Sequence, residues 1–118
     1  MRNIDEMERK LQQIADYYEF DAQLNQVVEE CGELIQAAAK YNRTKGKGYD
    51  TSMNLGAAYA NLVEELADVQ LVVCQLVYLM ECGDEVLDVT ELKIDRQLKR
   101  IGERKKEAQN AKSEDNAS

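Results

Sequence analysis

The sequence predicts an all-α protein, and three features of the chain support this class. Its 118 residues include no Pro, no Trp and only six Gly, so few residues interrupt helices. Charged residues make up 32% and apolar residues 44%, a balance typical of soluble helical proteins. The apolar run from Leu66 to Met80 contains neither Gly nor Pro and is about four helical turns long. We expect one domain over residues 1–106.

Two helices are predicted before residue 42. Asn3 can cap the first helix, with Glu6 at the spacing of a capping box, and this helix should end near Tyr18. Asp21 can cap the second helix, which should run to about Tyr41. The second helix has one apolar stripe, which consists of Leu24, Val27, Val28, Cys31, Leu34, Ile35 and Ala38.

The rest of the chain should contain a loop, two more helices and a tail. Residues 42–52 include two glycines and several turn formers, which predicts a mobile loop. The central helix should begin between Ser52 and Ala57 and end at Gly83, a natural left-handed C-cap. Asp84 can cap the last helix, which becomes basic toward its C-terminal end. Residues 107–118 lack apolar periodicity, so a disordered tail is expected.

Charge and cysteine content limit the possible partners and the compartment. A net charge of −8 argues against a nucleic-acid surface, which needs a basic stripe. Cys31, Cys74 and Cys82 are odd in number and widely spaced, which favours reduced thiols in a cytosol. The N-terminus has no apolar signal core, and the central run is short and carries Asp68, so no membrane association is expected. The sequence therefore predicts a soluble cytoplasmic protein.

Two carboxylate pairs are the candidate functional residues. Glu30 and Glu33 lie in the second predicted helix, and Glu65 and Asp68 lie in the central one, each pair at i, i+3. This spacing places both members of a pair on one helix face. If the two helices pack antiparallel, all four carboxylates can meet at one point. The central helix also has a polar strip, which consists of Asn61, Glu64, Glu65, Asp68 and Gln75.

The carboxylates either face water or hold cations, because burying them uncompensated costs several kcal/mol. Solvated Glu-x-x-Glu pairs are common on helices, so a single pair is weak evidence for a metal site. The metal hypothesis rests on the presence of two pairs on neighbouring helices. A di-iron bundle site is disfavoured because the chain contains no His. Carboxylate oxygens suit Mg²⁺ best and Mn²⁺ next, and Mg²⁺ leaves positions open for water and phosphates. The site therefore suggests phosphate chemistry.

These residues resemble the MazG-like, all-α nucleoside triphosphate pyrophosphohydrolase superfamily, whose mark is Glu-x-x-Glu followed by Glu-x-x-Asp. The resemblance covers residues 24–100 and includes the sequences 29–34 and 64–69. It implies a four-to-five-helix bundle that forms a homodimer or homotetramer, with the site completed near the interface. It also implies hydrolysis of an NTP or dNTP between the α and β phosphates, by water that a metal or a carboxylate activates. The implied Mg²⁺ ligands and catalytic residues are Glu30, Glu33, Glu65 and Asp68.

The resemblance further implies that the last helix contacts substrate phosphates, and four of its residues could do so: Lys93, Arg96, Gln97 and Arg100. Basic residues late in a helix are also favoured by the helix dipole alone. Two other functions stay open. One is hydrolysis of a related phosphoanhydride, dUTP or phosphoribosyl-ATP, and the other is a non-enzymatic helical oligomerisation module.

Overall fold

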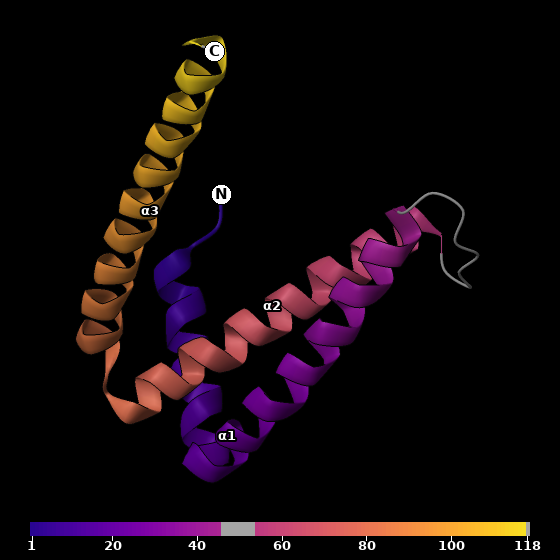
Figure 1. Ribbon diagram of the computed structural model, residues 1–118. Coiled ribbons are helices and arrows are strands. Elements are labelled where there is room, and N and C mark those ends of the chain that lie inside the picture. The colour runs from indigo at the N-terminus through magenta and orange to yellow at the C-terminus, as the bar shows by residue number, and fades with distance from the viewer. Residues whose placement is uncertain (46–53, 118) are drawn as a thin grey trace. The chain divides into compact units, whose positions relative to one another are not determined.

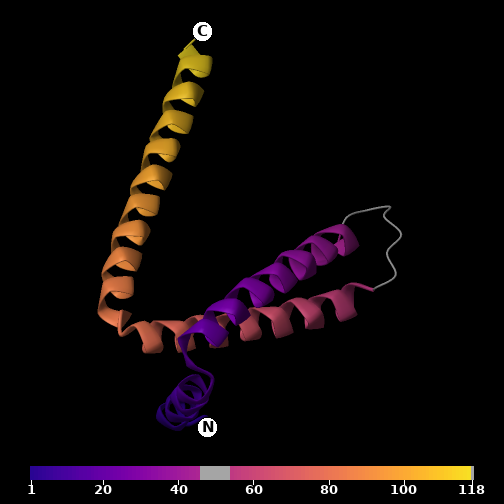
Figure 2. The same cartoon turned by 90° about the horizontal axis from the view of Figure 1, so that it is seen from below.

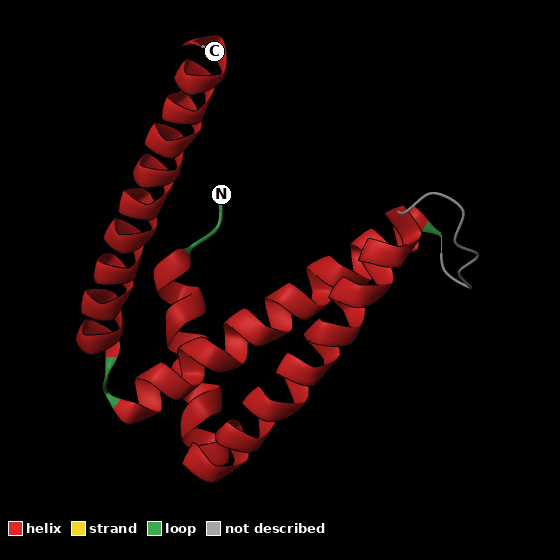
Figure 3. Cartoon of the chain, viewed as in Figure 1, coloured by secondary structure: helices red, strands yellow, loops and turns green. Residues whose placement is uncertain are grey.

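The protein is helical throughout the residues that the computed structural model describes, which are 1–45 and 54–117 (Figures 1 and 3). The helices are α1 (Ile4–Lys45), α2 (Leu55–Met80) and α3 (Gly83–Ala117). The all-α prediction is confirmed, and no strand occurs among the described residues. In the same residues, no helix has an apolar stretch long enough to cross a bilayer.

Helix α1 contains both of the helices predicted before residue 42, joined at a kink. Glu19 has φ 70° and ψ 174°, a non-helical conformation that lies between the predicted end near Tyr18 and the predicted cap Asp21. Figure 2 shows the N-terminal part of α1 leaving the direction of the rest at this point. The predicted break was therefore placed correctly, but the chain changes direction there without a loop.

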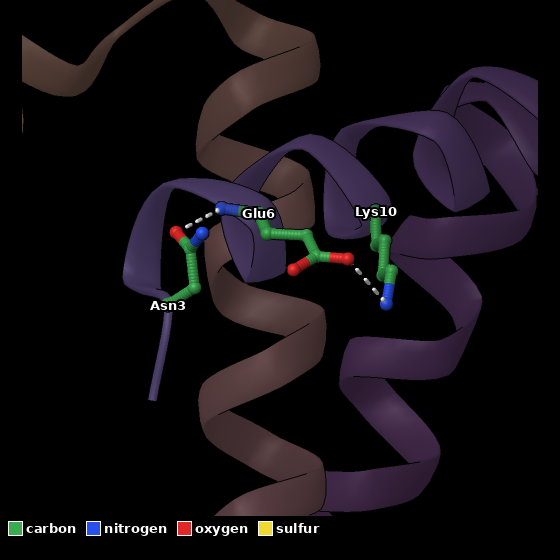
Figure 4. Close-up of polar contacts among 3 residues, drawn as sticks. All are labelled: Asn3, Glu6 and Lys10. Carbon is green, nitrogen blue, oxygen red and sulfur yellow. Dashed lines mark hydrogen bonds and ion pairs between the residues drawn. The ribbon is translucent and has the colours of Figure 1, made fainter. Parts of the chain in front are cut away.

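The first turn of α1 is capped as the sequence predicts. The backbone N–H of Glu6 donates to Asn3 Oδ1 at 3.0 Å (Figure 4). The Glu6 carboxylate also forms an exposed ion pair with Lys10, one turn further on, at 3.2 Å. The capping hydrogen bond satisfies one of the unpaired N–H groups at the helix start, so it fixes where α1 begins.

Helix α2 begins within the predicted interval but ends earlier than predicted. Asn54 is its N-cap and accepts a hydrogen bond from Ala57 N at 2.8 Å. The left-handed C-cap is Glu81, with φ 52° and ψ 38°, so the prediction of Gly83 in this role was wrong. The chain turns at Glu81, and Gly83 already begins α3. Asp84 consequently lies in the first turn of α3, where its negative charge interacts favourably with the positive end of the helix dipole.

Two predicted irregular segments contain helix. Helix α1 continues to Lys45, into the predicted loop at residues 42–52, whose remainder lies outside the described residues. Helix α3 continues through residues 107–117, where a disordered tail was expected. Ala, Lys, Glu and Gln in that segment are strong helix formers, so local propensity supports a helix without an apolar stripe.

The contacts divide the chain into residues 1–81 and 82–118, and each unit is described by itself. In the first unit, α2 lies antiparallel to the C-terminal part of α1 (Figures 1 and 2). Gln23 meets Gln75 near one end of this hairpin, and Tyr41 meets Tyr59 near the other. The second unit contains α3, on which no described residue is buried. The expectation of a single domain over 1–106 stays a prediction.

Candidate metal centre

The α1–α2 hairpin brings the four candidate carboxylates together. Glu30 and Glu33 come from α1, and Glu65 and Asp68 come from α2. One oxygen of each lies within 4.8 Å of the corresponding oxygens of the other three. The i, i+3 spacing places each pair on one face of its helix, and the antiparallel arrangement turns the two faces toward each other. We call these four residues the carboxylate cluster.

Two oxygens of the carboxylate cluster are buried without hydrogen bonds. Glu30 Oε2 and Glu65 Oε2 are inaccessible to solvent and have no partner among the described residues. Glu30, Glu65 and Asp68 are half-buried, whereas Glu33 is exposed. Buried carboxylate oxygens normally have hydrogen-bond or ionic partners, because desolvation without compensation is costly. These oxygens therefore need either a proton or a cation.

The electrostatics of the cluster also indicate that its carboxylates need a proton or a cation. Desolvation raises the pKa of Glu30 above its ordinary value, and repulsion from Glu33 and Asp68 raises it further. Desolvation also raises the pKa of Glu65, with further contributions from Glu33 and Asp68. No Lys or Arg among the described residues forms an ion pair with these carboxylates. The negative charge of the cluster is thus uncompensated by this part of the protein.

The donor set and spacing fit a hard divalent cation. Oxygens that bind a single Mg²⁺ at about 2.1 Å can be at most about 4.2 Å apart, and those of Ca²⁺ about 5 Å apart. The observed upper separation of 4.8 Å fits Ca²⁺ directly, and Mg²⁺ would require the most distant oxygens to move about 0.6 Å closer together. Carboxylates alone, without Cys or His, select cations of this class.

A buried amide pair fixes the helix register beside the cluster. Gln23 Nε2 donates to Gln75 Oε1 at 2.6 Å, and Gln75 Nε2 donates to the Leu11 carbonyl at 3.3 Å. Gln23 and Gln75 lie seven residues from Glu30 and Asp68, which is about two turns along the same faces. Because both amides are buried, a shift of α1 against α2 would leave them without partners. The pair thus holds the two helices in the register that assembles the cluster.

The rest of the predicted polar strip has a different environment. Asn61 is half-buried, Glu64 is exposed, and Gln75 is buried in the amide pair. Sequence analysis placed Gln75 on the strip but missed its structural role. Its partner Gln23 lies on the other helix, 52 residues away, and no local sequence pattern links the two. A second contact joins the kinked part of α1 to α2, since Tyr78 OH donates to the Asp16 carboxylate at 3.0 Å.

The candidate phosphate ligands lie in the second unit. Four exposed side chains of α3 make up this set: Lys93, Arg96, Gln97 and Arg100. Each is accessible to a ligand, and their role at the carboxylate cluster stays a prediction.

Comparison of the chain with family models, with curated proteins and with solved structures found no match.

Proposed function

We propose that the protein is a Mg²⁺-dependent nucleotide pyrophosphohydrolase that cleaves an NTP or dNTP to the monophosphate and pyrophosphate. The observation that carries this proposal is the convergence of four carboxylates, two of which contain buried oxygens without partners. The resemblance of both acidic motifs to the MazG-like superfamily supplies the reaction class. The same resemblance makes a homodimer or homotetramer in the cytoplasm part of the proposal, with removal of surplus or noncanonical nucleotides as the role.

The residues of the cluster have two tasks in this reaction. Glu30, Glu33, Glu65 and Asp68 would hold Mg²⁺, or Mn²⁺ in its place, which when bound neutralises the charge of the polyphosphate. A carboxylate oxygen not engaged in this way accepts a proton from water. The water oxygen attacks the α-phosphorus, the bond from that phosphorus to the α,β-bridging oxygen breaks, and pyrophosphate leaves. A raised pKa makes Glu30 or Glu65 a stronger proton acceptor than an ordinary glutamate.

The substrate phosphates need cationic partners besides the metal. Lys93, Arg96, Gln97 and Arg100 offer N–H donors from successive turns of α3 and belong to this part of the proposal. Related phosphoanhydrides, dUTP or phosphoribosyl-ATP, require the same groups and are alternative substrates.

A non-enzymatic oligomerisation module is the second candidate function, and exposed apolar side chains favour it. Large side chains such as Val28 and Ile35 on α1 and Leu66 on α2 are half or more exposed. This function needs no metal, so it predicts that divalent cations leave the stability of the fold unchanged.

Pyrophosphate release from a panel of NTPs and dNTPs, with and without Mg²⁺, tests the enzyme proposal. Glu65→Ala and Asp68→Ala should each lower the rate by about 100-fold or more. Removing a residue that hydrogen-bonds to a metal ligand typically lowers activity by about 10- to 100-fold, and removing the ligand itself costs at least as much. Glu64→Ala is the matched control, because Glu64 is exposed and outside the cluster. Full activity in Glu65→Ala would refute the site, and no Mg²⁺-dependent hydrolysis of any panel member would refute the function.

A further inference from the structure

Two hydrogen bonds attach the N-terminal part of α1 to α2. We call residues 4–18, which precede the kink, the N-terminal segment. Gln75 Nε2 donates to the Leu11 carbonyl at 3.3 Å. The Tyr78 hydroxyl, one turn further along α2, donates to the Asp16 carboxylate at 3.0 Å. The segment is therefore docked on the C-terminal half of α2.

The docked segment is a weakly held part of the first unit. Glu19, directly after it, has φ 70° and ψ 174°, a conformation that strains residues other than Gly. Of residues 4–18, all of which the structure describes, only Ala15 is buried. A free helix of this length is marginal at best in water, so a released segment also unfolds. Local release of the segment should thus precede unfolding of the hairpin.

Gln75 joins the segment to the contact that sets the helix register. Its side-chain oxygen accepts from Gln23 Nε2 at 2.6 Å, while its side-chain nitrogen donates to the Leu11 carbonyl. Gln23 follows the kink and Leu11 precedes it, so one amide holds both parts of α1. Gln75 is only 1% exposed, and loss of either partner leaves a buried polar group unpaired. Release of the segment therefore removes one of the two contacts that fix the Gln75 side chain.

The register that Gln75 holds determines the geometry of the carboxylate cluster. Gln75 lies two turns from Asp68 on α2, and Gln23 lies two turns from Glu30 on α1. A slip by one residue moves one helix along the other by about 1.5 Å. The ligand oxygens already lie up to 4.8 Å apart, and a single Mg²⁺ requires about 4.2 Å or less. A slip of this size would therefore separate opposing carboxylates too far to share one ion.

We infer that Gln75 is a positioning residue that couples docking of the N-terminal segment to cation binding at the carboxylate cluster. The ion binds best to the correctly registered hairpin, and the docked segment stabilises that register through Gln75. Coupling between two binding equilibria is reciprocal. Bound Mg²⁺ therefore opposes release of the segment, and release of the segment weakens Mg²⁺ binding. This inference rests on the metal centre of the proposed function, but not on nucleotide hydrolysis.

Hydrogen exchange of the full chain, followed by mass spectrometry of its peptides, tests whether Mg²⁺ opposes release. At a Mg²⁺ concentration 100 times the dissociation constant, amides of residues 4–18 should exchange at least fivefold more slowly than in EDTA. Peptides from residues 83–117, in the other unit, should not change. Glu65→Gln lacks a ligand and should lose the slowing. Unchanged exchange of the segment in the Mg²⁺-bound wild-type chain would overturn the inference.

Two variants distinguish coupling through Gln75 from simple attachment of the segment. Gln75→Leu and Tyr78→Phe each remove one hydrogen bond between the segment and α2, so both should exchange faster in EDTA. Only Gln75 also contacts Gln23. With each variant at 100 times its own Mg²⁺ dissociation constant, the slowing by Mg²⁺ should fall below twofold in Gln75→Leu and stay at least fivefold in Tyr78→Phe. Equal slowing in both would show that Gln75 has only a structural role, contrary to the inference.

Calorimetric titration with Mg²⁺ tests the reciprocal effect, and it decides the question even if Gln75→Leu fails to fold. Ala15→Arg places a charge at the buried position of the segment, so it should release the segment and raise the Mg²⁺ dissociation constant at least fivefold. Gln13→Arg adds the same charge at an exposed position and should change it less than twofold. Equal constants would overturn the coupling alone, whereas a wild-type chain that binds no Mg²⁺ would refute the metal centre as well.

Discussion

Binding of Mg²⁺ to the carboxylate cluster should stabilise the folded protein, and this is the sharpest consequence of the geometry. The unfolded chain separates Glu30 and Glu33 from Glu65 and Asp68 by more than thirty residues of sequence. Only the folded hairpin brings one oxygen of each within 4.8 Å of the others. A cation held by all four therefore binds the native state and adds RT ln(1 + [Mg²⁺]/Kd) to its stability.

The size of the effect follows from this relation. At a Mg²⁺ concentration 100 times the dissociation constant, the free energy of unfolding should rise by about 2.7 kcal/mol. For a chain of this length that corresponds to an increase in Tm of roughly 10 °C. Nonspecific screening of the net charge of −8 also stabilises the fold, so the comparison must be made at constant ionic strength with KCl as the balancing salt.

Urea unfolding followed by circular dichroism, across a Mg²⁺ titration, measures this shift. Glu65→Gln removes a ligand and should reduce the shift to less than a third of the wild-type value. Glu64→Gln changes the adjacent residue, which is exposed and outside the cluster, and should keep the full shift. Equal shifts in the two variants, or none in the wild-type chain at millimolar Mg²⁺, would refute the reasoning.

Three further predictions concern stability without metal. In EDTA no divalent cation occupies the cluster, and the pKa values of Glu30 and Glu65 are raised in the folded state. The folded state therefore binds more protons than the unfolded chain. The contribution of these two carboxyl groups to stability should fall as the pH rises from about 4.5 through their raised pKa values. Glu65→Gln should flatten the profile of urea midpoint against pH relative to Glu64→Gln, and superimposable profiles would contradict this. Gln75→Leu leaves the buried Gln23 amide without its acceptor and should cost about 1–3 kcal/mol in urea unfolding, whereas exposed Gln70→Leu should cost almost nothing. Glu19→Gly should raise the free energy of unfolding by about 1 kcal/mol, because φ 70° with ψ 174° is a region that essentially only Gly adopts. Glu8→Gly, in a regular part of α1, should lower it, and a loss in both variants would argue against strain at Glu19.

Local signals in the sequence predicted the helices well. Composition and the long apolar run without Gly or Pro predicted the all-α class, and a capping-box spacing predicted the cap at Asn3. The start of α2 lies within the predicted interval. The break near residues 18–21 was also predicted, because the first apolar row ends near Tyr18 and Asp21 is a plausible N-cap. The meeting of Glu30 with Asp68 could be anticipated because i, i+3 pairs on antiparallel helices face each other.

Other features depended on competition between local preferences. A glycine at position 83 could end α2, but the helix ends earlier. Glu81 adopts the left-handed conformation, and its backbone N–H donates to the Tyr78 carbonyl. The helix therefore stops two residues before the glycine. Residues 107–117 have strong helix propensity but no apolar stripe, so the periodicity rule predicted a tail where propensity continues α3. Gln23 and Gln75 look like ordinary polar residues until both are buried against each other. Sequence patterns do not report such pairing across fifty residues.

Whether the metal centre needs a second copy of the chain can be measured. If the four carboxylates of one chain are enough to hold the ion, the monomeric chain should keep its response to Mg²⁺. At concentrations where the chain is monomeric, the Mg²⁺-induced gain in the free energy of unfolding should then equal the gain at high concentration, per chain, within about 0.5 kcal/mol, as for independent sites. The MazG-like resemblance implies instead that the site is completed near the interface, in which case the monomer should lose most of the gain. Urea unfolding at low and high chain concentration, with and without Mg²⁺, distinguishes the two arrangements, because a partner's ligand contributes only when the partner is bound.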